Sequence, residues 1–139
     1  MGCPALMPQK LLLDTHIWLW SLLEPHRLSA KVARALAIGT NELWISPISS
    51  WEIMMLCDKK RLSLAPDAAK WITVPLLKVP CREAPLTHEV AVATSRVQLP
   101  HRDPVDCFLA ATALVFKLTL VTGDENILSG SGFSTLANK

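Results

Sequence analysis

Glycine is scarce in this 139-residue sequence, with 5 residues, and tyrosine is absent. The sequence contains neither GxGxxG nor a GxxxxGK motif, the glycine-rich patterns that hold phosphates against backbone N–H groups. The 4 histidines and 4 cysteines show no metal-ligand spacing and no CxxC pair. These absences exclude a nucleotide- or flavin-binding α/β protein, and no zinc site is expected.

No apolar stretch is long enough to cross a membrane. The longest, residues 107–116, ends at Lys117 and falls well short of the roughly 20 residues that a bilayer requires. The first residues lack the charged-then-apolar order of a signal peptide. The widely spaced cysteines are typical of reduced thiols in a cytosol. The sequence therefore predicts a cytoplasmic protein without a membrane partner.

Neither sign of charge dominates. The 14 Lys and Arg against 12 Asp and Glu leave a net charge of +2, which permits a nucleic-acid partner without requiring one. Half of the residues are hydrophobic and 19% are charged, which excludes intrinsic disorder. The length predicts a single domain over 1–139, with residues 1–9 as a loose N-terminal extension. The mean hydropathy of +0.31 favours some apolar surface reserved for a partner.

Short apolar runs alternate with helical patterns along the chain. The runs predict buried strands at 10–13, 43–46 and 118–122, and further strands at 77–79 and 133–136. Helices are predicted at 16–23, 48–61 and 66–74, and others capped by Ser29, Thr87 and Asp103 run to about 38, 97 and 116. This alternation predicts an α/β three-layer sandwich with a central, mostly parallel sheet of four to five strands.

Four acids fall where the carboxyl ends of parallel strands meet. Asp14 directly follows the first predicted strand, and Asp124 comes two residues after a later one. Glu52 lies in the opening turns of the helix that follows the second strand. Parallel strands end at one edge of the sheet, where open α/β folds place their sites, and Asp106 joins them if its helix starts at that edge. The sequence therefore predicts a cluster of four carboxylates.

Such a cluster requires a counter-charge, because several carboxylates within about 4–6 Å cannot all stay ionised without one. An oxygen-lined cavity suits Mg²⁺ or Mn²⁺, which retain several waters and bind phosphate oxygens. Acids, a hard cation and a phosphate together describe metal-assisted phosphodiester hydrolysis. In that reaction the cation makes hydroxide available near neutral pH and stabilises the charge of the transition state.

Each acid also has a structural interpretation. An Asp after a strand, as at Asp14 and Asp124, is often a turn or capping residue. Asp103 is a good N-cap before Pro104, and Asp106 would complete an approximate capping box at the positive end of the helix dipole. Glu52 is harder to explain in this way, because it interrupts an apolar segment. Taken jointly, the acids favour a site.

At these acids the sequence resembles the PIN-domain ribonucleases of the VapC type, the toxins of type II toxin–antitoxin systems. The matching segments occur in the family's order and span nearly the whole chain from Lys10. They are LLLDTH at 11–16, SWEI at 50–53, HRDPVD at 101–106, LAATA at 109–113 and LVTGD at 120–124.

The resemblance implies a Mg²⁺- or Mn²⁺-dependent endoribonuclease with a PIN-like fold. It implies a homodimer neutralised by a cognate antitoxin protein, with DNA contacted only indirectly through that antitoxin. Carried over by position, the catalytic acids would be Asp14, Glu52, Asp106 and Asp124, and the metal ligands would be Asp14, Asp106 and Asp124. Thr122 would assist them, and Asp103 would be a supporting neighbour.

Two basic segments are candidates for contacts with RNA phosphates, one before the Asp103 cap and one at a helix end. Both are also typical of an exposed loop and of a solvated helix terminus. The candidate residues are His101, Arg102, Lys59, Lys60 and Arg61. Relatives commonly carry an arginine where this chain has Cys107, so the resemblance implies that a cation next to the site is missing here.

Five tryptophans are an unusual aromatic choice. Trp18 and Trp20 differ by about 200° around one helix and cannot easily both face the core. The apolar excess around them and around Trp51, Met54 and Met55 predicts a groove or dimer face for a partner. The alternative to an enzyme is a non-catalytic PIN-like module that binds RNA or protein without cutting. The four acids speak against it, and metal titration discriminates between the two.

Overall fold

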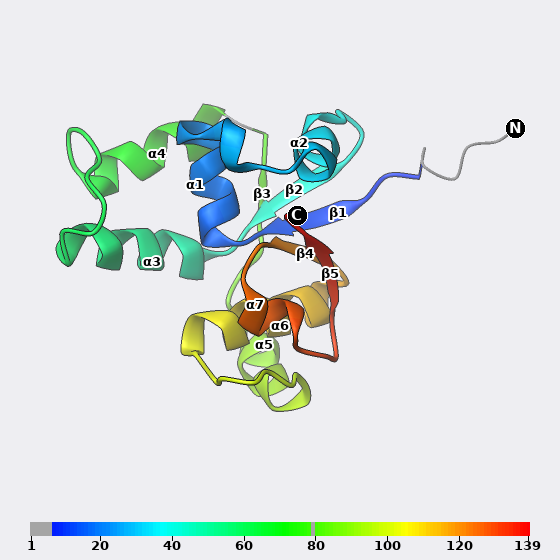
Figure 1. Cartoon of the computed structure of the whole chain (residues 1–139). Helices are drawn as coiled ribbons and strands as arrows, with labels where there is room; N and C mark the ends of the chain where they lie inside the picture. The colour runs from blue at the N-terminus through cyan, green and yellow to red at the C-terminus, as the bar shows by residue number, and fades with distance from the viewer. Residues whose placement is uncertain (1–6, 79) are drawn as a thin grey trace, which may run out of the picture.

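A computed structural model describes residues 7–78 and 80–139. The chain forms five strands and a set of helices that alternate with them (Figure 1). In chain order they are β1 (Lys10–Leu13), α1 (Thr15–Leu23), η2 (Pro25–Arg27), α2 (Ala30–Ala37), β2 (Glu42–Ile45), α3 (Pro47–Asp58), α4 (Ala68–Lys78), β3 (Arg82–Glu83), α5 (His88–Ala93), η3 (Thr94–Arg96), α6 (Pro104–Phe116), β4 (Thr119–Thr122), α7 (Glu125–Leu128) and β5 (Ser134–Ala137). In the described part of the chain, no helix is long and apolar enough to cross a membrane.

The five strands form one parallel sheet in the order β3-β2-β1-β4-β5. Leu12 on β1 lies opposite Trp44 on β2 and Leu120 on β4, which fixes the register of the three central strands. The side chains of 11–13 are all buried because helices cover both faces of the sheet, as is usual for parallel strands. The predicted α/β sandwich is confirmed.

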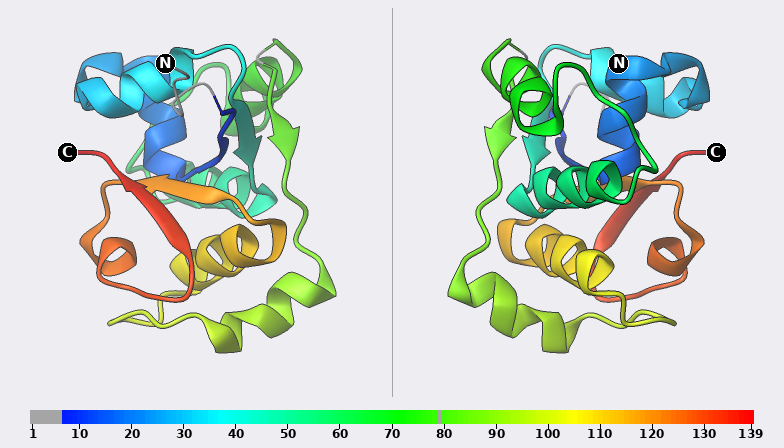
Figure 2. Two further views of the ribbon diagram at one scale, coloured as in Figure 1. Left: turned by 90° about the vertical axis from the view of Figure 1, so that its right-hand side faces the viewer. Right: turned by 90° about the vertical axis from the view of Figure 1, so that its left-hand side faces the viewer.

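Two buried clusters hold the helices on the sheet. Leu11 and Leu13 face a cluster that includes residues of α1, α2 and α4, whereas Leu12 faces the other side and packs with α6 and α7. Figures 1 and 2 show α1, α2 and α4 on one face and α5, α6 and α7 on the other. Helix α3 contacts α1, α4 and α6, and so it joins the two layers.

The predicted strand at 77–79 is wrong. Leu77 belongs to α4 and is 81% exposed, and Val79 lies outside the described residues. The buried residues Ala68, Ile72 and Pro75 have helical spacing, and this periodicity outweighs the short apolar run after them. The edge strand is β3 instead, which consists of two exposed charged residues and therefore carries no apolar signal.

Helix starts agree better with the sequence prediction than helix ends. Ser29, Thr87 and Asp103 are N-caps as predicted, and each side chain accepts a backbone N–H of the first turn. Ser46, predicted as the last residue of a strand, caps α3, which ends at Asp58 and not at Arg61. Of the predicted N-terminal extension, residues 1–6 lie outside the described residues. Gln9 is hydrogen-bonded to Asn41 and Glu42 and is thereby tied to β2.

Candidate functional site

Asp14 stands at the carboxyl end of β1 and is almost fully buried. Its backbone N–H continues the sheet by donating to the Val121 carbonyl at 3.1 Å. One carboxylate oxygen, Oδ1, accepts the His16 N–H at 2.8 Å and so caps α1. The other, Oδ2, accepts the Thr122 hydroxyl at 2.5 Å. The carboxylate is thus held in one orientation from two sides.

Thr122 connects Asp14 with Asp124. The Thr122 hydroxyl is fully buried; it donates to Asp14 and accepts the Asp124 N–H at 3.0 Å. Asp124 in turn caps α7, where its Oδ1 accepts the Asn126 N–H at 2.8 Å. The strand ends of β1 and β4 therefore bring these two carboxylates to one edge of the sheet, as the sequence predicts.

Asp106 lies in the first turn of α6, half-buried, and does not complete the expected capping box. Asp103 accepts the Asp106 N–H at 3.2 Å, but the Asp106 carboxylate is held from another element. Its Oδ2 accepts the Asn126 side-chain amide at 2.8 Å. The same amide group donates to the His101 carbonyl at 2.8 Å and accepts the His101 N–H at 2.7 Å.

Asn126 was missed by the sequence analysis, although it lies only two residues after Asp124 in the strand-end motif. Its side chain joins the start of α7, the loop before α6 and the Asp106 carboxylate. Because Asn supplies both donors and an acceptor, one side chain can satisfy all three groups. Asn126 therefore positions Asp106 relative to Asp124.

Glu52 approaches from α3. It is half-buried and close to the Thr15 hydroxyl at the start of α1. Thr15 is fully buried, and its hydroxyl donates to the Ser49 hydroxyl at 3.0 Å, one turn before Glu52 on α3. The beginnings of α1 and α3 are thereby joined next to Asp14, which places Glu52 on the same side of the sheet edge.

Three of the four acids, Asp14, Glu52 and Asp106, have pKa values above their ordinary values. Burial raises the pKa of Asp14 above its ordinary value, against the opposing hydrogen bond from Thr122, and the charge of Asp124 adds to the rise. Burial also raises the pKa of Glu52, with Asp14 and Asp103 as further causes. For Asp106, burial and the charges of Asp124, Asp103 and Asp14 raise the pKa to about 6. Neighbouring carboxylates thus add to the effect of burial in disfavouring the charged form of these three acids.

The donor set suits a hard divalent cation. Asp14, Asp106 and Asp124 could hold one, since each offers carboxylate oxygen, the ligand type that Mg²⁺ and Mn²⁺ prefer. In the described residues, no three His, Cys, Asp or Glu side chains are arranged to hold an ion directly. This arrangement is compatible with Mg²⁺, because that ion keeps several waters and needs few direct protein ligands.

The raised pKa of Asp106 predicts how stability depends on pH. The folded protein keeps this proton up to about pH 6, whereas the unfolded chain releases it near the ordinary value of 3.8. The folded state therefore binds more protons in this window, so the free energy of unfolding falls as pH rises from about 4 to about 6. Thermal unfolding of the metal-free protein measures this slope, which we expect to be shallower in Asp106→Asn.

A matched control for this pH effect is Asp58→Asn, at the exposed far end of α3. This variant should keep the slope of the wild type. Identical slopes in Asp106→Asn and in the wild type would contradict the raised pKa.

Of the candidate RNA-binding residues, His101 adjoins the acids through Asn126, whereas the run 59–61 lies away from them. The Arg102 guanidinium donates to the Val97 and Thr94 carbonyls at 2.9 and 2.8 Å, so it holds the loop after η3. His101 is exposed, and its backbone is bound to Asn126. The exposed run 59–61 follows the last turn of α3, about 18 Å of helix away from the end that faces the site.

Cys107 stands in α6 directly after Asp106. Cys107 is buried, and so this position does not present its side chain to the open side of the acid cluster.

Trp18 is buried in the core, whereas Trp20 is half-buried with the Arg27 guanidinium 4.3 Å from its ring centre. The predicted division of the two tryptophans is confirmed, but the predicted groove cannot include Trp18. Trp51, by contrast, is 52% exposed on α3.

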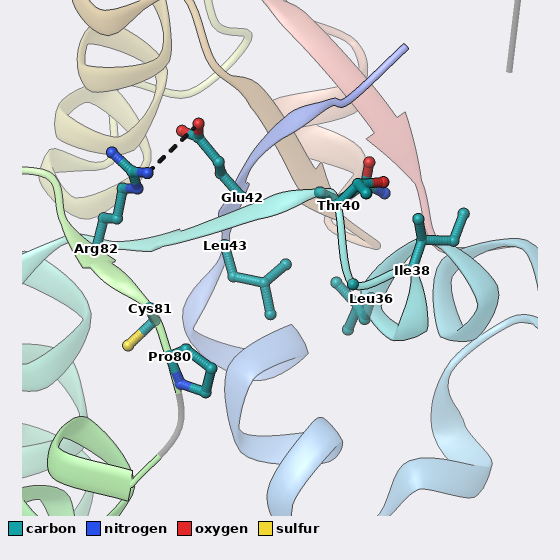
Figure 3. A pocket seen from close by; sticks show the side chains of 10 residues that line it. Leu36, Ile38, Thr40, Glu42, Leu43, Pro80, Cys81 and Arg82 are labelled. Carbon is teal, nitrogen blue, oxygen red and sulfur yellow. Dashed lines mark ion pairs between the residues drawn. The ribbon is translucent and has the colours of Figure 1, made fainter. Parts of the chain in front are cut away.

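Another depression of the described surface lies away from the acids. It encloses about 580 Å³ at the amino ends of β2 and β3, opposite the edge that carries the acids (Figure 3). Its one carboxylate in the described lining, Glu42, is paired with Arg82 at 3.6 Å. With its charge already matched, this depression lacks the features of a cation or phosphate site.

Comparisons with known proteins agree with this geometry. A family model described as PIN domain matches residues 11–130. Ribonuclease VapC22 of Mycobacterium tuberculosis is 33% identical over 121 residues, which are 85% of this chain and 89% of that protein.

Solved structures show the same fold at lower sequence identity. VapBC2 from Rickettsia felis, bound to a DNA fragment from its promoter, matches with a TM-score of 0.68 and 14% identity. DNA-bound VapBC from Salmonella typhimurium matches with a TM-score of 0.68 and 18% identity. Each comparison covers 93% of this chain and 98% of the other. Because the family model spans most of the sequence and a VapC ribonuclease is 33% identical across most of both chains, the chain belongs to the PIN domain family.

Proposed function

We propose that this protein is a Mg²⁺- or Mn²⁺-dependent endoribonuclease that acts in the cytoplasm as the toxin of a toxin–antitoxin pair. The observation that carries the proposal is the junction of Asp14, Thr122, Asp124, Asn126 and Asp106 by successive hydrogen bonds. It holds three carboxylates at one edge of the sheet, with Glu52 beside them. The 33% identity to a VapC ribonuclease supports RNA as the substrate.

In this proposal each residue of the site has a separate task. Asp14, Asp106 and Asp124 would hold the cation, while Thr122 orients the Asp14 carboxylate and Asn126 orients that of Asp106. Glu52 takes the proton of the attacking water, because its raised pKa makes it a better base than an exposed carboxylate. When bound, the cation supplies a Lewis acid for the phosphate and lowers the pKa of a water. Asp103 contributes by capping the helix that carries Asp106.

The direct test is incubation of the purified protein with RNA, with Mg²⁺ or Mn²⁺ and with a chelator. Attack by water on the phosphate leaves no cyclic phosphate, so we expect the linear phosphate and hydroxyl ends of simple hydrolysis. Cleavage that requires the cation supports the proposal. RNA binding without cleavage in either metal would assign the chain to a non-catalytic binding module instead.

A cognate antitoxin is the proposed protein partner, and DNA would be contacted only through it. The structural neighbours that are complexes of VapB and VapC bound to DNA support this idea. Coexpression with the product of a small neighbouring gene should relieve the growth arrest that the ribonuclease causes alone. Growth arrest that persists during coexpression with every adjacent gene product would contradict the proposed antitoxin partner.

The proposed homodimer would use an apolar face next to the acids. This α3–α6 face is a depression of about 390 Å³ lined by Pro47, Ile48, Trp51, Leu86, Pro104, Val105 and Phe108. Exposed aromatic and aliphatic groups of this kind are typical of interfaces, where a central Trp often dominates the binding energy.

Trp51→Glu is expected to weaken the dimer by about 2 kcal/mol or more, since it places a charge in the centre of the α3–α6 face. The folded subunit should keep its melting temperature, because Trp51 is 52% exposed there. Sedimentation equilibrium measures the dimer. Val92→Glu, at a 72% exposed position on α5, is the matched control. Equal dimer stability in both variants would contradict this choice of face.

A further inference from the structure

A depression of about 380 Å³ opens beside the acids, and part of its wall is aromatic and cationic. The residues that line it are Asp14, His16, Trp20, Arg27, Gly123 and Asp124. The two carboxylates belong to the proposed cation site. The wall of His16, Trp20 and Arg27 has no task in the chemistry described above, although it faces the same opening.

Trp20 lies at the centre of this wall, with Arg27 over its ring and His16 tilted against it. The Arg27 guanidinium lies 4.3 Å from the centre of the Trp20 ring, and the His16 ring lies 5.8 Å from it at 50°. His16 and Arg27 are both exposed to solvent. Arg27 is also 3.7 Å from Glu24, but both side chains are about half exposed, at 49% and 48%. A pair this exposed is weak, and a phosphate can replace it.

The wall is held in place relative to the acids by Asn138 near the end of the chain. The Asn138 side-chain amide donates to the Arg27 carbonyl at 3.1 Å, and its oxygen accepts the Ser29 N–H at 2.6 Å. The backbone N–H of Asn138 donates to the Thr122 carbonyl at 2.8 Å. Since Thr122 also bonds to Asp14, Arg27 is connected to the carboxylates through few intervening groups.

We propose that His16, Trp20 and Arg27 form a nucleotide subsite for single-stranded RNA. The subsite holds a nucleotide adjacent to the cleaved phosphodiester bond. Arg27 contacts the phosphate of that adjacent nucleotide, and the His16 ring packs against the base of the same nucleotide. Proteins recognise unpaired RNA by stacking bases on aromatic side chains and by forked contacts of arginine with phosphate. The inference rests on the proposed ribonuclease function, for which it names the missing substrate contacts.

The charge arrangement supports this choice. The acids repel a phosphate unless a cation stands between, whereas Arg27 attracts the next phosphate along the strand without one. The other basic residues considered for RNA are engaged, distant or outside this depression. Arg102 is bound to backbone carbonyls, the run 59–61 lies at the far end of α3, and His101 is not among the lining residues. Arg27 is therefore the cation best placed at this opening.

The test uses the shortest oligoribonucleotide that the wild type cleaves. Arg27→Gln should raise KM about tenfold and change kcat little, the pattern expected for loss of a contact made equally in the ground and transition states. Arg34→Gln removes the same charge from an exposed position on α2 outside the depression and should leave KM unchanged. Arg27→Lys should recover part of the loss, because it keeps the charge but not the fork.

RNA substrates with one uncharged phosphate analogue show which phosphate Arg27 contacts. Replacing one phosphate next to the cut by methylphosphonate should raise KM of the wild type about as much as Arg27→Gln does, and should add nothing in that variant. Likewise, an abasic nucleotide at the subsite should raise KM of the wild type but not of His16→Ala, whose backbone N–H can still donate to the Asp14 carboxylate. These paired effects do not depend on the variants having the stability of the wild type.

The outcomes separate the subsite from the proposed function. Cleavage by the wild type with equal KM in Arg27→Gln and Arg34→Gln would overturn the subsite and leave the ribonuclease function intact. Absence of cleavage by the wild type would overturn both. Loss of antitoxin affinity in Arg27→Gln without any change in KM would assign the wall to that protein, and the RNA subsite would be wrong.

Discussion

Asp106→Asn is expected to slow RNA cleavage on the order of 10³-fold while the protein stays folded. The substitution removes the charge of a carboxylate that faces Asp124 and Asp14, and it keeps an oxygen that can accept the Asn126 amide. Single-turnover cleavage of one RNA measures the loss. Asp14→Asn, Glu52→Gln and Asp124→Asn should behave alike, and none of the four should arrest growth when expressed alone.

The controls separate catalysis from helix capping. Asp103→Asn should lose less activity, because Asn caps a helix nearly as well as Asp and the bond to the Asp106 N–H can persist. Asp58→Asn, at the far end of α3, should cleave like the wild type. If Asp106→Asn also cleaved RNA at the wild-type rate, its carboxylate would have only the structural role of a charge at a helix start.

Mg²⁺ or Mn²⁺ is expected to raise the melting temperature of the wild type by roughly 8 °C at 100-fold excess over its dissociation constant. Binding to the folded state alone stabilises it by about 2.7 kcal/mol under those conditions, and a domain of this length shifts by about 3 °C per kcal/mol. The relief of repulsion among Asp14, Asp106 and Asp124 is the physical source. Scanning calorimetry with and without the cation measures the shift.

For this effect the comparison is between two Asp-to-Asn variants. Asp14→Asn should show a clearly smaller shift, since it removes a buried carboxylate of the cluster. Asp58→Asn removes an exposed carboxylate elsewhere and should show the full shift. Equal shifts in all three proteins would mean that the cation binds without Asp14.

The local pattern of the sequence was enough to predict the central layers. Uninterrupted apolar residues at 11–13 and 120–121 can be buried on both faces only in the middle of a parallel sheet. The acids that follow these strands come to one edge for the same reason. Asp103 as a cap is equally local, because a capping bond spans only three residues.

The edge strand β3 and the end of α4 could not be predicted from local sequence patterns. Strand β3 has two charged residues and exists because Trp44 and Ile45 of β2 offer backbone partners to Arg82 and Glu83. The helix α4 extends past the expected end at residue 74 because Ile72 and Pro75 are buried on one side of it, a fact that depends on the neighbouring helices. Both features are set by tertiary contacts and not by propensity.

At the site, the sequence by itself determined which chemical groups are present, and the tertiary structure decided which of them meet. Asp14, Asp106 and Asp124 could be selected from strand ends and a helix start, but Asn126 bonds to His101 across 25 positions of the chain. Thr122 similarly reaches Asp14 across 108 positions, and Asn138 reaches Arg27 across 111. Contacts over such separations form only when the sheet has brought its strands together, and no local periodicity encodes them.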